Sequence, residues 1–465
     1  MLITRAEIGG AAPLDVRIAE GTIAEVAPSL GRRPGEPVLD AAGGVLLPGL
    51  HDHHLHLLAL GAALTSVPCG PPQVRDADGL ARALSSVRGE KGWIRGVGYF
   101  ESVAGEPGRE QLDRLVPERP LRIQHRTGVL WMLNSAAVSR LGLDRGVDAP
   151  GVERDGAGRA TGRLFHLDAW LRERVGSERP PDLGEVGHRL ARCGVTSVTD
   201  ATAETGPVEL EILVAAADAG AVQQRILVMG LPTLPDPSHA RVVRSAVKVR
   251  LAEDALPAFD DVTQIVRRAC EAGRGVALHC VTRAELVFAA AVLEAAGARR
   301  GSRIEHAAIA PPDAVAFLAR LGARVVCNPS FVRERGDDYL AHVDAGDVPW
   351  LHRCRGFLAA GIPLGAGTDA PFGVFDPWQA MRAAVDRRTE AGAVLGADER
   401  LSPEEALALF LAPGATPGGA ARRIAPGEPA DLCLLDRPWR DARERLLADD
   451  VVATFADGAV IWQRS

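Results

Sequence analysis

The feature that most constrains the fold of this chain is a regular alternation of short apolar segments with longer helical ones. Between the apolar segments lie stretches rich in Ala, Arg and Glu with helical spacing, such as 261–273 and 285–297. Near-continuous apolar strands, each followed by a helix, are typical of a parallel sheet that is buried on both faces. Eight such strands predict an α/β protein built on a closed (β/α)8 barrel, the TIM barrel. The candidate strands are 44–56, 194–200, 224–230, 246–251, 275–280, 302–307, 323–329 and 362–369.

Both ends of the chain depart from this alternation. Residues 1–48 carry a period-2 pattern on either side of Glu20-Gly21, and 420–465 carry another beside Asp457-Gly458. Period 2 with a glycine turn predicts β-hairpins. We therefore expect a small β-sandwich domain that is built from both chain ends.

A second departure separates the first candidate strand from the next. Residues 58–190 contain Gly/Pro-rich loops, a strand-like segment at 121–125 and an amphipathic helix around 134–141. We interpret this stretch as an insertion over the barrel mouth. The barrel domain then comprises 49–57 and 191–419.

Composition excludes several classes of partner. The chain has 465 residues with 60 acidic and 53 basic side chains, and a net charge of -7 argues against nucleic acid. It contains no uncharged apolar run of about 18 residues, so we expect no membrane partner. Seven cysteines without a paired spacing suggest reduced thiols and a cytoplasmic protein. The expected partner is a small-molecule substrate, and a homodimer remains open.

Chemistry-bearing side chains gather at the carboxyl ends of the candidate strands, where barrel enzymes place their active groups. On the first strand, His54 and His56 are two residues apart, so both imidazoles lie on the same face. Such a pair suits a divalent metal such as zinc. His51 and His53 form a competing pair on the opposite face. We prefer His54 and His56 because they lie nearer the carboxyl end.

Lys248 stands inside the apolar strand 246–251, and it is one of only two lysines among the 53 basic residues. An ammonium group is costly to bury unpaired. It can pair with a carboxylate, or it can react with carbon dioxide to give a carbamate that bridges two metals. Arginine cannot form that carbamate, so the choice of lysine in a lysine-poor chain is informative.

Three further strands end in a polar side chain, namely His279, His306 and Asp369. Taken singly, each histidine could be a core residue and Asp369 a helix N-cap. Glu305 should point away from the face of His306 and form a structural ion pair. Six such groups at the same end of one predicted barrel are hard to attribute to chance, and together they predict a metal site.

At these residues the sequence resembles the amidohydrolase superfamily of metal-dependent hydrolases, in the same motif order. It looks most like amidohydrolase family 3, the branch that includes the N-substituted formamide deformylases. The resemblance covers nearly the whole chain. The superfamily motifs are LLPGLHDHHLHL (46–57), AVKVRL (246–251), VALHC (276–280), RIEHA (303–307) and GAGTDAP (365–371). The branch motifs are WIRGVGYFES (93–102), QLDRLVPERPL (111–121), LNSAAVSRLGL (133–143), TGRLF (161–165) and DAPFGVFDPWQAMRAAV (369–385).

The resemblance implies a role for each residue. His54 and His56 would bind the more buried metal, and carboxylated Lys248 would bridge it to a second metal on His279 and His306. Asp369 would contact the first metal and act as the catalytic acid and base. Zinc is the implied cofactor, with one or two ions per chain, although these ligands accept other divalent metals.

The implied reaction is hydrolysis of a non-peptide C–N bond, the amide of a small N-acyl, N-formyl or cyclic substrate, by metal-activated hydroxide. One alternative is a mononuclear-metal deaminase acting on a heterocycle, although such deaminases generally lack the lysine on strand four. A metal-dependent lyase or decarboxylase is another. A non-catalytic scaffold is disfavoured because all the ligands are retained.

Three residues are candidates for substrate binding. Arg353 and Tyr339 come from the segment before the eighth strand, and Trp131 comes from the insertion. Each also has a structural interpretation, as a surface arginine, a loop-packing tyrosine and a core tryptophan. Five histidines outside the motifs are interpreted as surface or packing residues, namely His166, His188, His239, His342 and His352.

Overall fold

The computed structural model describes residues 1–464 except 11, 88–91, 148, 177–179 and 298–300. The chain forms two compact units. The first comprises Met1–Leu57 together with Leu183–Ser465, and the second comprises Leu58–Asp182. The predicted insertion, 58–190, extends slightly beyond the second unit, because Gly184–Arg192 forms helix α7 on the strands of the first unit.

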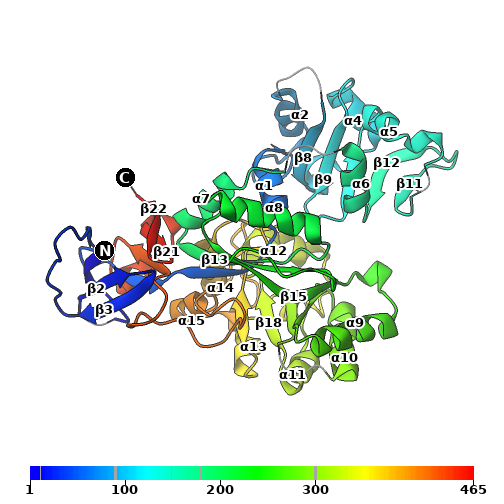
Figure 1. The fold of residues 1–465 in the computed structure, drawn as a ribbon. Coiled ribbons are helices and arrows are strands. Elements are labelled where there is room, and N and C mark those ends of the chain that lie inside the picture. Colours follow the sequence, from blue (N-terminus) through cyan, green and yellow to red (C-terminus); the bar gives the residue numbers. More distant parts are fainter. Residues whose placement is uncertain (11, 88–91, 148, 177–179, 298–300, 465) are drawn as a thin grey trace. The chain divides into compact units, whose positions relative to one another are not determined.

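The first unit contains an eight-stranded parallel sheet, and each of the eight predicted segments supplies one strand (Figure 1). The predicted TIM barrel is therefore confirmed. The order in the sheet is the order in the chain, as expected for successive β/α units. The strands are β6 (Leu50–Leu55), β13 (Val195–Asp200), β14 (Arg225–Gly230), β15 (Val242–Arg250), β16 (Val276–Cys280), β17 (Arg303–His306), β18 (Arg324–Cys327) and β19 (Leu364–Ala366).

The first and last strands of this sheet meet through two sets of backbone hydrogen bonds. At the carboxyl end, Asp369 N donates to His54 O at 2.7 Å and His56 N donates to Ala370 O at 2.9 Å. At the amino end, segment 409–410 completes the closure, because Ala366 N and His51 N donate to its carbonyls. The barrel thus brings the motif after β19 directly beside the histidine motif of β6.

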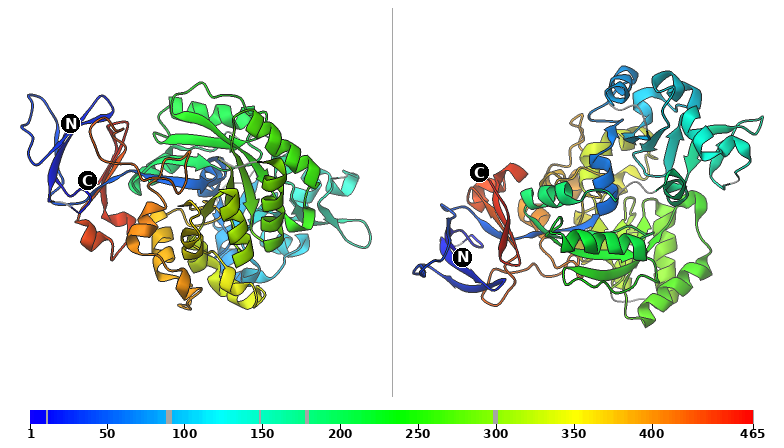
Figure 2. Two further views of the ribbon diagram at one scale, coloured as in Figure 1. Left: turned by 90° about the horizontal axis from the view of Figure 1, so that it is seen from below. Right: turned by 45° about the horizontal axis from the view of Figure 1, so that its top comes forward.

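Helices follow the strands and lie outside the sheet (Figure 2). The helix α10 illustrates how its sequence sets its ends: Thr282 and Glu285 form a capping box, and Gly297 in the left-handed conformation terminates it. The helices of the barrel are α7, α8 (Pro207–Asp218), α9 (Phe259–Glu271), α10 (Arg283–Ala296), α11 (Pro312–Leu321), α12 (Ser330–His342), α13 (Arg355–Ala359), α14 (Pro377–Asp386) and α15 (Pro403–Ala408).

The two chain ends form two four-stranded sheets that share one apolar core. Ile3 and Ile23 of one sheet and Leu432 and Phe455 of the other belong to this core, and all are at most 1% exposed. The additional strand domain expected from both termini is thus present (Figures 1 and 2). Its strands are β1 (Leu2–Ala6), β2 (Leu14–Ala19), β3 (Thr22–Ala27), β4 (Val38–Asp40), β5 (Leu46–Pro48), β20 (Leu432–Leu435), β21 (Val451–Ala456) and β22 (Ala459–Gln463).

The second unit is built on a six-stranded mixed sheet with its own apolar core. The predicted strand at 121–125 is β9 (Leu121–His125), and the predicted helix at 134–141 is α5 (Ser135–Leu141), which Asn134 caps. The other strands are β7 (Val67–Pro68), β8 (Ile94–Tyr99), β10 (Leu130–Leu133), β11 (Val152–Arg154) and β12 (Ala160–Phe165). The other helices include α2 (Ala77–Ser85), α4 (Arg109–Leu115) and α6 (Asp168–Val175).

A search of the helices within the described ranges found none that combines the length and the apolarity needed to cross a bilayer.

Candidate metal centre

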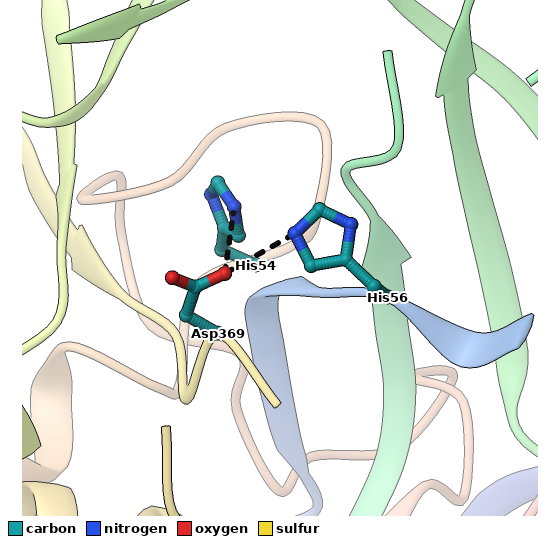
Figure 3. Close-up of side chains that lie close together, drawn as sticks. All are labelled: His54, His56 and Asp369. Carbon is teal, nitrogen blue, oxygen red and sulfur yellow. Dashed lines mark hydrogen bonds and ion pairs between the residues drawn. The ribbon is translucent and has the colours of Figure 1, made fainter. Parts of the chain in front are cut away.

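His54, His56 and Asp369 converge at the carboxyl end of the barrel sheet (Figure 3). His54 belongs to β6, His56 follows it, and Asp369 follows β19 in the left-handed conformation with φ 56°. Asp369 Oδ1 lies 3.4 Å from His54 Nε2 and 3.1 Å from His56 Nε2. One ligand atom from each residue lies within 4.8 Å of the other two, so this trio could hold one metal ion.

Two further histidines lie beside this trio. The His306 ring is 4.7 Å from the His54 ring and 4.5 Å from the His279 ring, measured between centroids. His279 is the penultimate residue of β16 and His306 is the last residue of β17, and the two strands are neighbours in the sheet. The four predicted histidines therefore form one continuous cluster with Asp369.

Hydrogen bonds to Nδ1 orient three of these imidazoles. His54 Nδ1 bonds Glu305 Oε2, His56 Nδ1 lies 2.9 Å from Thr202 Oγ1, and His306 Nδ1 lies 2.7 Å from Asn328 Oδ1. The Asn328 side chain is itself oriented, because its Nδ2 donates to Gly367 O at 2.9 Å. With Nδ1 engaged, each ring can offer Nε2 as a ligand, which is how metal-binding histidines are usually supported.

Lys248 of β15 is buried in the same region. Its Nζ lies 3.9 Å from Glu305 Oε2 and has no hydrogen-bond partner among the described residues. Burial lowers the pKa of Lys248, although the negative charge of Glu305 opposes that shift. Burying an amine without a hydrogen bond costs free energy. A reaction of the amine, or a ligand that bonds to it, would remove that cost.

The protonation states match a metal site. Burial lowers the pKa of His54 to about 3 and also lowers those of His279 and His306, so the imidazoles are neutral, the form that ligates metals. Burial raises the pKa of Asp369, but stabilisation of the carboxylate by its histidine neighbours, above all the hydrogen bond from His56, outweighs it. The carboxyl pKa therefore lies well below its ordinary value, and Asp369 is ionised.

The predicted orientation of the Glu305 side chain was wrong. Glu305 is fully buried and ion-paired with Arg303, as expected, but it also bonds to His54 and approaches Lys248. Strict alternation fails here because His306 has φ 67° and Ala307 has φ 45°, so the chain leaves the extended conformation at the strand end. Glu305 and His306 therefore both reach the cluster.

Sequence reasoning also missed Thr202 and Asn328, which follow the second and seventh barrel strands. Their position at the strand ends is the signal that could have found them. The competing pair lies elsewhere: His51 bonds to Ser197 and Thr199 of β13, and His53 stacks against His51 with ring centroids 4.4 Å apart.

The three predicted substrate residues are engaged in other contacts. Arg353 Nε donates to Glu399 Oε1 at 2.7 Å, and Trp131 Nε1 donates to Asp168 Oδ1 at 2.8 Å within the second unit. The Tyr339 ring lies 5.3 Å from the ring of His352. A substrate role for Arg353, Tyr339 and Trp131 stays a prediction.

The fold defines a TIM barrel joined to a domain of strands, and a model of the amidohydrolase family matches residues 37–462. The chain belongs to this family, in its family 3 branch, and is therefore a hydrolase of carbon–nitrogen bonds from a metal-dependent family.

Relatives agree with this assignment over most of their length. The chain is 26% identical to the N-substituted formamide deformylase of Arthrobacter pascens, over 93% of this chain and 91% of that one. It is 23% identical to the putative amidohydrolase YtcJ of Bacillus subtilis, over 91% and 90%. In fold it is similar to an uncharacterized metal-dependent hydrolase of Pyrococcus horikoshii, with a TM-score of 0.72, 21% identity and coverage of 94% and 96%.

Proposed function

We propose that this protein is a zinc-dependent hydrolase that cleaves the amide bond of a small N-acyl, N-formyl or cyclic amide. The observation that carries the proposal is the convergence of imidazoles, ionised Asp369 and Lys248 Nζ, which has no hydrogen-bond partner among the described residues, at one end of the barrel. The similarity to an N-substituted formamide deformylase supports a small amide as the substrate.

The residues present fit a metal-ion site. His54, His56 and Asp369 would hold one ion, and His279 with His306 would hold a second. Carboxylation of Lys248 would turn its amine into an anionic ligand between them and would satisfy an atom that now lacks a hydrogen bond. When bound, such an ion lowers the pKa of water and polarises a carbonyl oxygen.

The protein's own groups supply proton transfer and orientation. Asp369 is ionised and only partly exposed, so it can accept a proton from water at Oδ2 and later donate it to the departing nitrogen. Thr202, Glu305 and Asn328 hold the rings of His56, His54 and His306 in place.

The free cysteines support the cytoplasmic location that we also propose.

The test combines metal analysis with a substrate screen. We expect about two zinc ions per chain in the wild type, fewer in Lys248→Ala, and an unchanged content in the control His342→Gln, whose side chain is exposed. Carbon-13 NMR after growth with labelled bicarbonate should show a carbamate signal that Lys248→Ala lacks. A library of formamides, N-acyl amines and lactams should yield a free amine.

Two outcomes would contradict this proposal. One metal that is unaffected by loss of Lys248 would refute the carbamate bridge. Release of ammonia from heterocycles, with no amide in the library cleaved, would establish the deaminase alternative instead.

A further inference from the structure

The predicted metal ligands differ in their exposure to solvent. The side chains of His54 and Lys248 are 1% and 3% exposed, whereas those of His56 and Asp369 are 17% and 10% exposed. His279 is also partly exposed, so a substrate can approach from the side of His56 and Asp369 or from that of His279. The residues that border His56 and Asp369 are among those that can select the substrate.

Phe372 borders this open side. Its ring lies 5.3 Å from the His56 ring, and its backbone N bonds to Asp369 O at 2.8 Å. The carbonyl of Phe372 accepts a hydrogen bond from Arg335 Nη2 at 2.6 Å. The Arg335 guanidinium group thus lies against the backbone of Phe372, the residue whose ring lies beside His56.

Arg335 lies on α12, four residues after Phe331, so the two side chains share a helix face. The Arg335 Cζ lies 3.9 Å from the centroid of the Phe331 ring. This stacking fixes the plane of the guanidinium while leaving most of its five N–H groups available.

Arg335 forms no direct ion pair with another described residue. Within the part of the chain that the structure describes, no carboxylate lies at ion-pair distance from it. Its neighbour Glu334 interacts with it electrostatically, but both Glu334 carboxylate oxygens accept from Val374 N at 3.1 Å. By contrast, the nearby Arg353 and Arg355 are paired with Glu399 and Glu405. A half-buried guanidinium without a direct ion pair is suited to a carboxylate ligand.

A second polar group, His352, also lies near Phe331. The His352 ring is 5.8 Å from the Phe331 ring, the residue is 2% exposed, and neither ring nitrogen has a hydrogen-bond partner among the described residues. Its backbone is held at φ 45° by Arg387, which donates to His352 O at 2.7 Å. This unusual conformation and the unbonded ring make a passive packing role a poor explanation of His352.

We infer that Arg335 is a specificity-determining residue that binds a carboxylate group of the substrate. The substrate class is then an N-acyl or N-formyl amino acid rather than a neutral amide. This inference rests on the proposed function, because it places the carboxylate next to the amide that the metal centre would cleave.

The test compares two probes that differ only in the carboxylate, N-formylphenylalanine, as each enantiomer, and N-(2-phenylethyl)formamide. Calorimetry on the metal-loaded protein measures the affinity for each probe, and turnover is measured separately. We expect one enantiomer of the acid to bind at least about 10-fold tighter than the neutral probe, as a charge-assisted contact requires. Arg335→Gln should abolish that preference, and Arg335→Lys should retain part of it.

Arg333→Gln is the matched control, because Arg333 lies on the same helix but is exposed. It should keep the wild-type preference. Equal affinity of the wild type for both probes, no binding of either, or an unchanged preference in Arg335→Gln would each overturn the inference.

The two proposals can fail separately. If the acid binds through Arg335 but no amide is cleaved, the proposed function fails and the carboxylate site stands. If the neutral probe is bound and cleaved as well as the acid, the proposed function stands and the inference fails.

Discussion

Replacing Asn328 with leucine should weaken metal binding without removing any ligand. Asn328 Oδ1 accepts from His306 Nδ1 at 2.7 Å, and both residues are buried. If His306 binds a metal through Nε2, its proton must stay on Nδ1. In Asn328→Leu that proton has no acceptor, whereas the metal-free ring can move it to Nε2. The penalty therefore falls on the metal-bound state.

The magnitude follows from the cost of a buried donor without a partner. That cost is about 1–3 kcal/mol, which corresponds to about 5- to 150-fold in the dissociation constant. Losses of supporting hydrogen bonds at other metal sites are about 10- to 100-fold, in the same range. We therefore expect the zinc dissociation constant of Asn328→Leu to rise by about 30-fold.

Competition with a chromophoric chelator measures this constant. Asn328→Asp is the matched control, because it keeps an acceptor for His306 Nδ1 and loses only the donor to Gly367 O. It should retain affinity within about 5-fold of the wild type. Unchanged zinc affinity in Asn328→Leu, or an equal loss in both variants, would refute the assigned role of His306 Nδ1.

Three further predictions concern the catalytic carboxylate, the buried ion pair and the sandwich. Asp369→Asn should lower kcat on any cleaved substrate by about 10²–10⁴-fold, since the asparagine side chain cannot accept a proton. A kcat within a few-fold of wild type would exclude Asp369 as the base. Glu305→Gln should destabilise the metal-free protein by about 3–5 kcal/mol, because it leaves Arg303 buried without a carboxylate; a thermal unfolding midpoint equal to that of wild type would contradict this. The hydrogen bond from Arg17 lowers the pKa of Glu36 to about 2, so its stabilisation is complete above about pH 4.3 and is lost as the pH falls towards 2. Thermal unfolding followed between those values should show a steeper loss in the wild type than in Glu36→Gln, and parallel curves would count against the pair.

Strand periodicity and strand order were sufficient to predict which side chains gather at the carboxyl end of the barrel. His54 and His56 share a face because side chains in an extended strand alternate, and this local rule needs no tertiary information. His279, Lys248 and Asp369 could be added because parallel strands of one barrel end at the same edge. The structure brings these residues together as that reasoning requires.

Contacts between side chains from different strands were not predictable in the same way. Glu305 was misplaced because the left-handed conformation of His306 breaks the alternation on which the prediction relied. Arg353 was nominated from its position in the chain, but Glu399, distant in sequence, engages its guanidinium. Local sequence does not distinguish Arg335 from other arginines, because its significance depends on Phe372 and Phe331 lying beside it.

The sequence by itself determined the barrel, the strand domain from both ends and the family, because each depends on local periodicity or on motifs in a set order. Tertiary structure alone decided which nitrogen of each histidine forms a hydrogen bond. It also decided that, among the described residues, Arg335 has no direct ion pair and the Lys248 amine has no hydrogen bond. The physical reason is that hydrogen bonds and ion pairs depend on distances of a few ångströms between atoms that are far apart in the chain. Those distances arise only when the barrel closes and brings Asp369 beside His54.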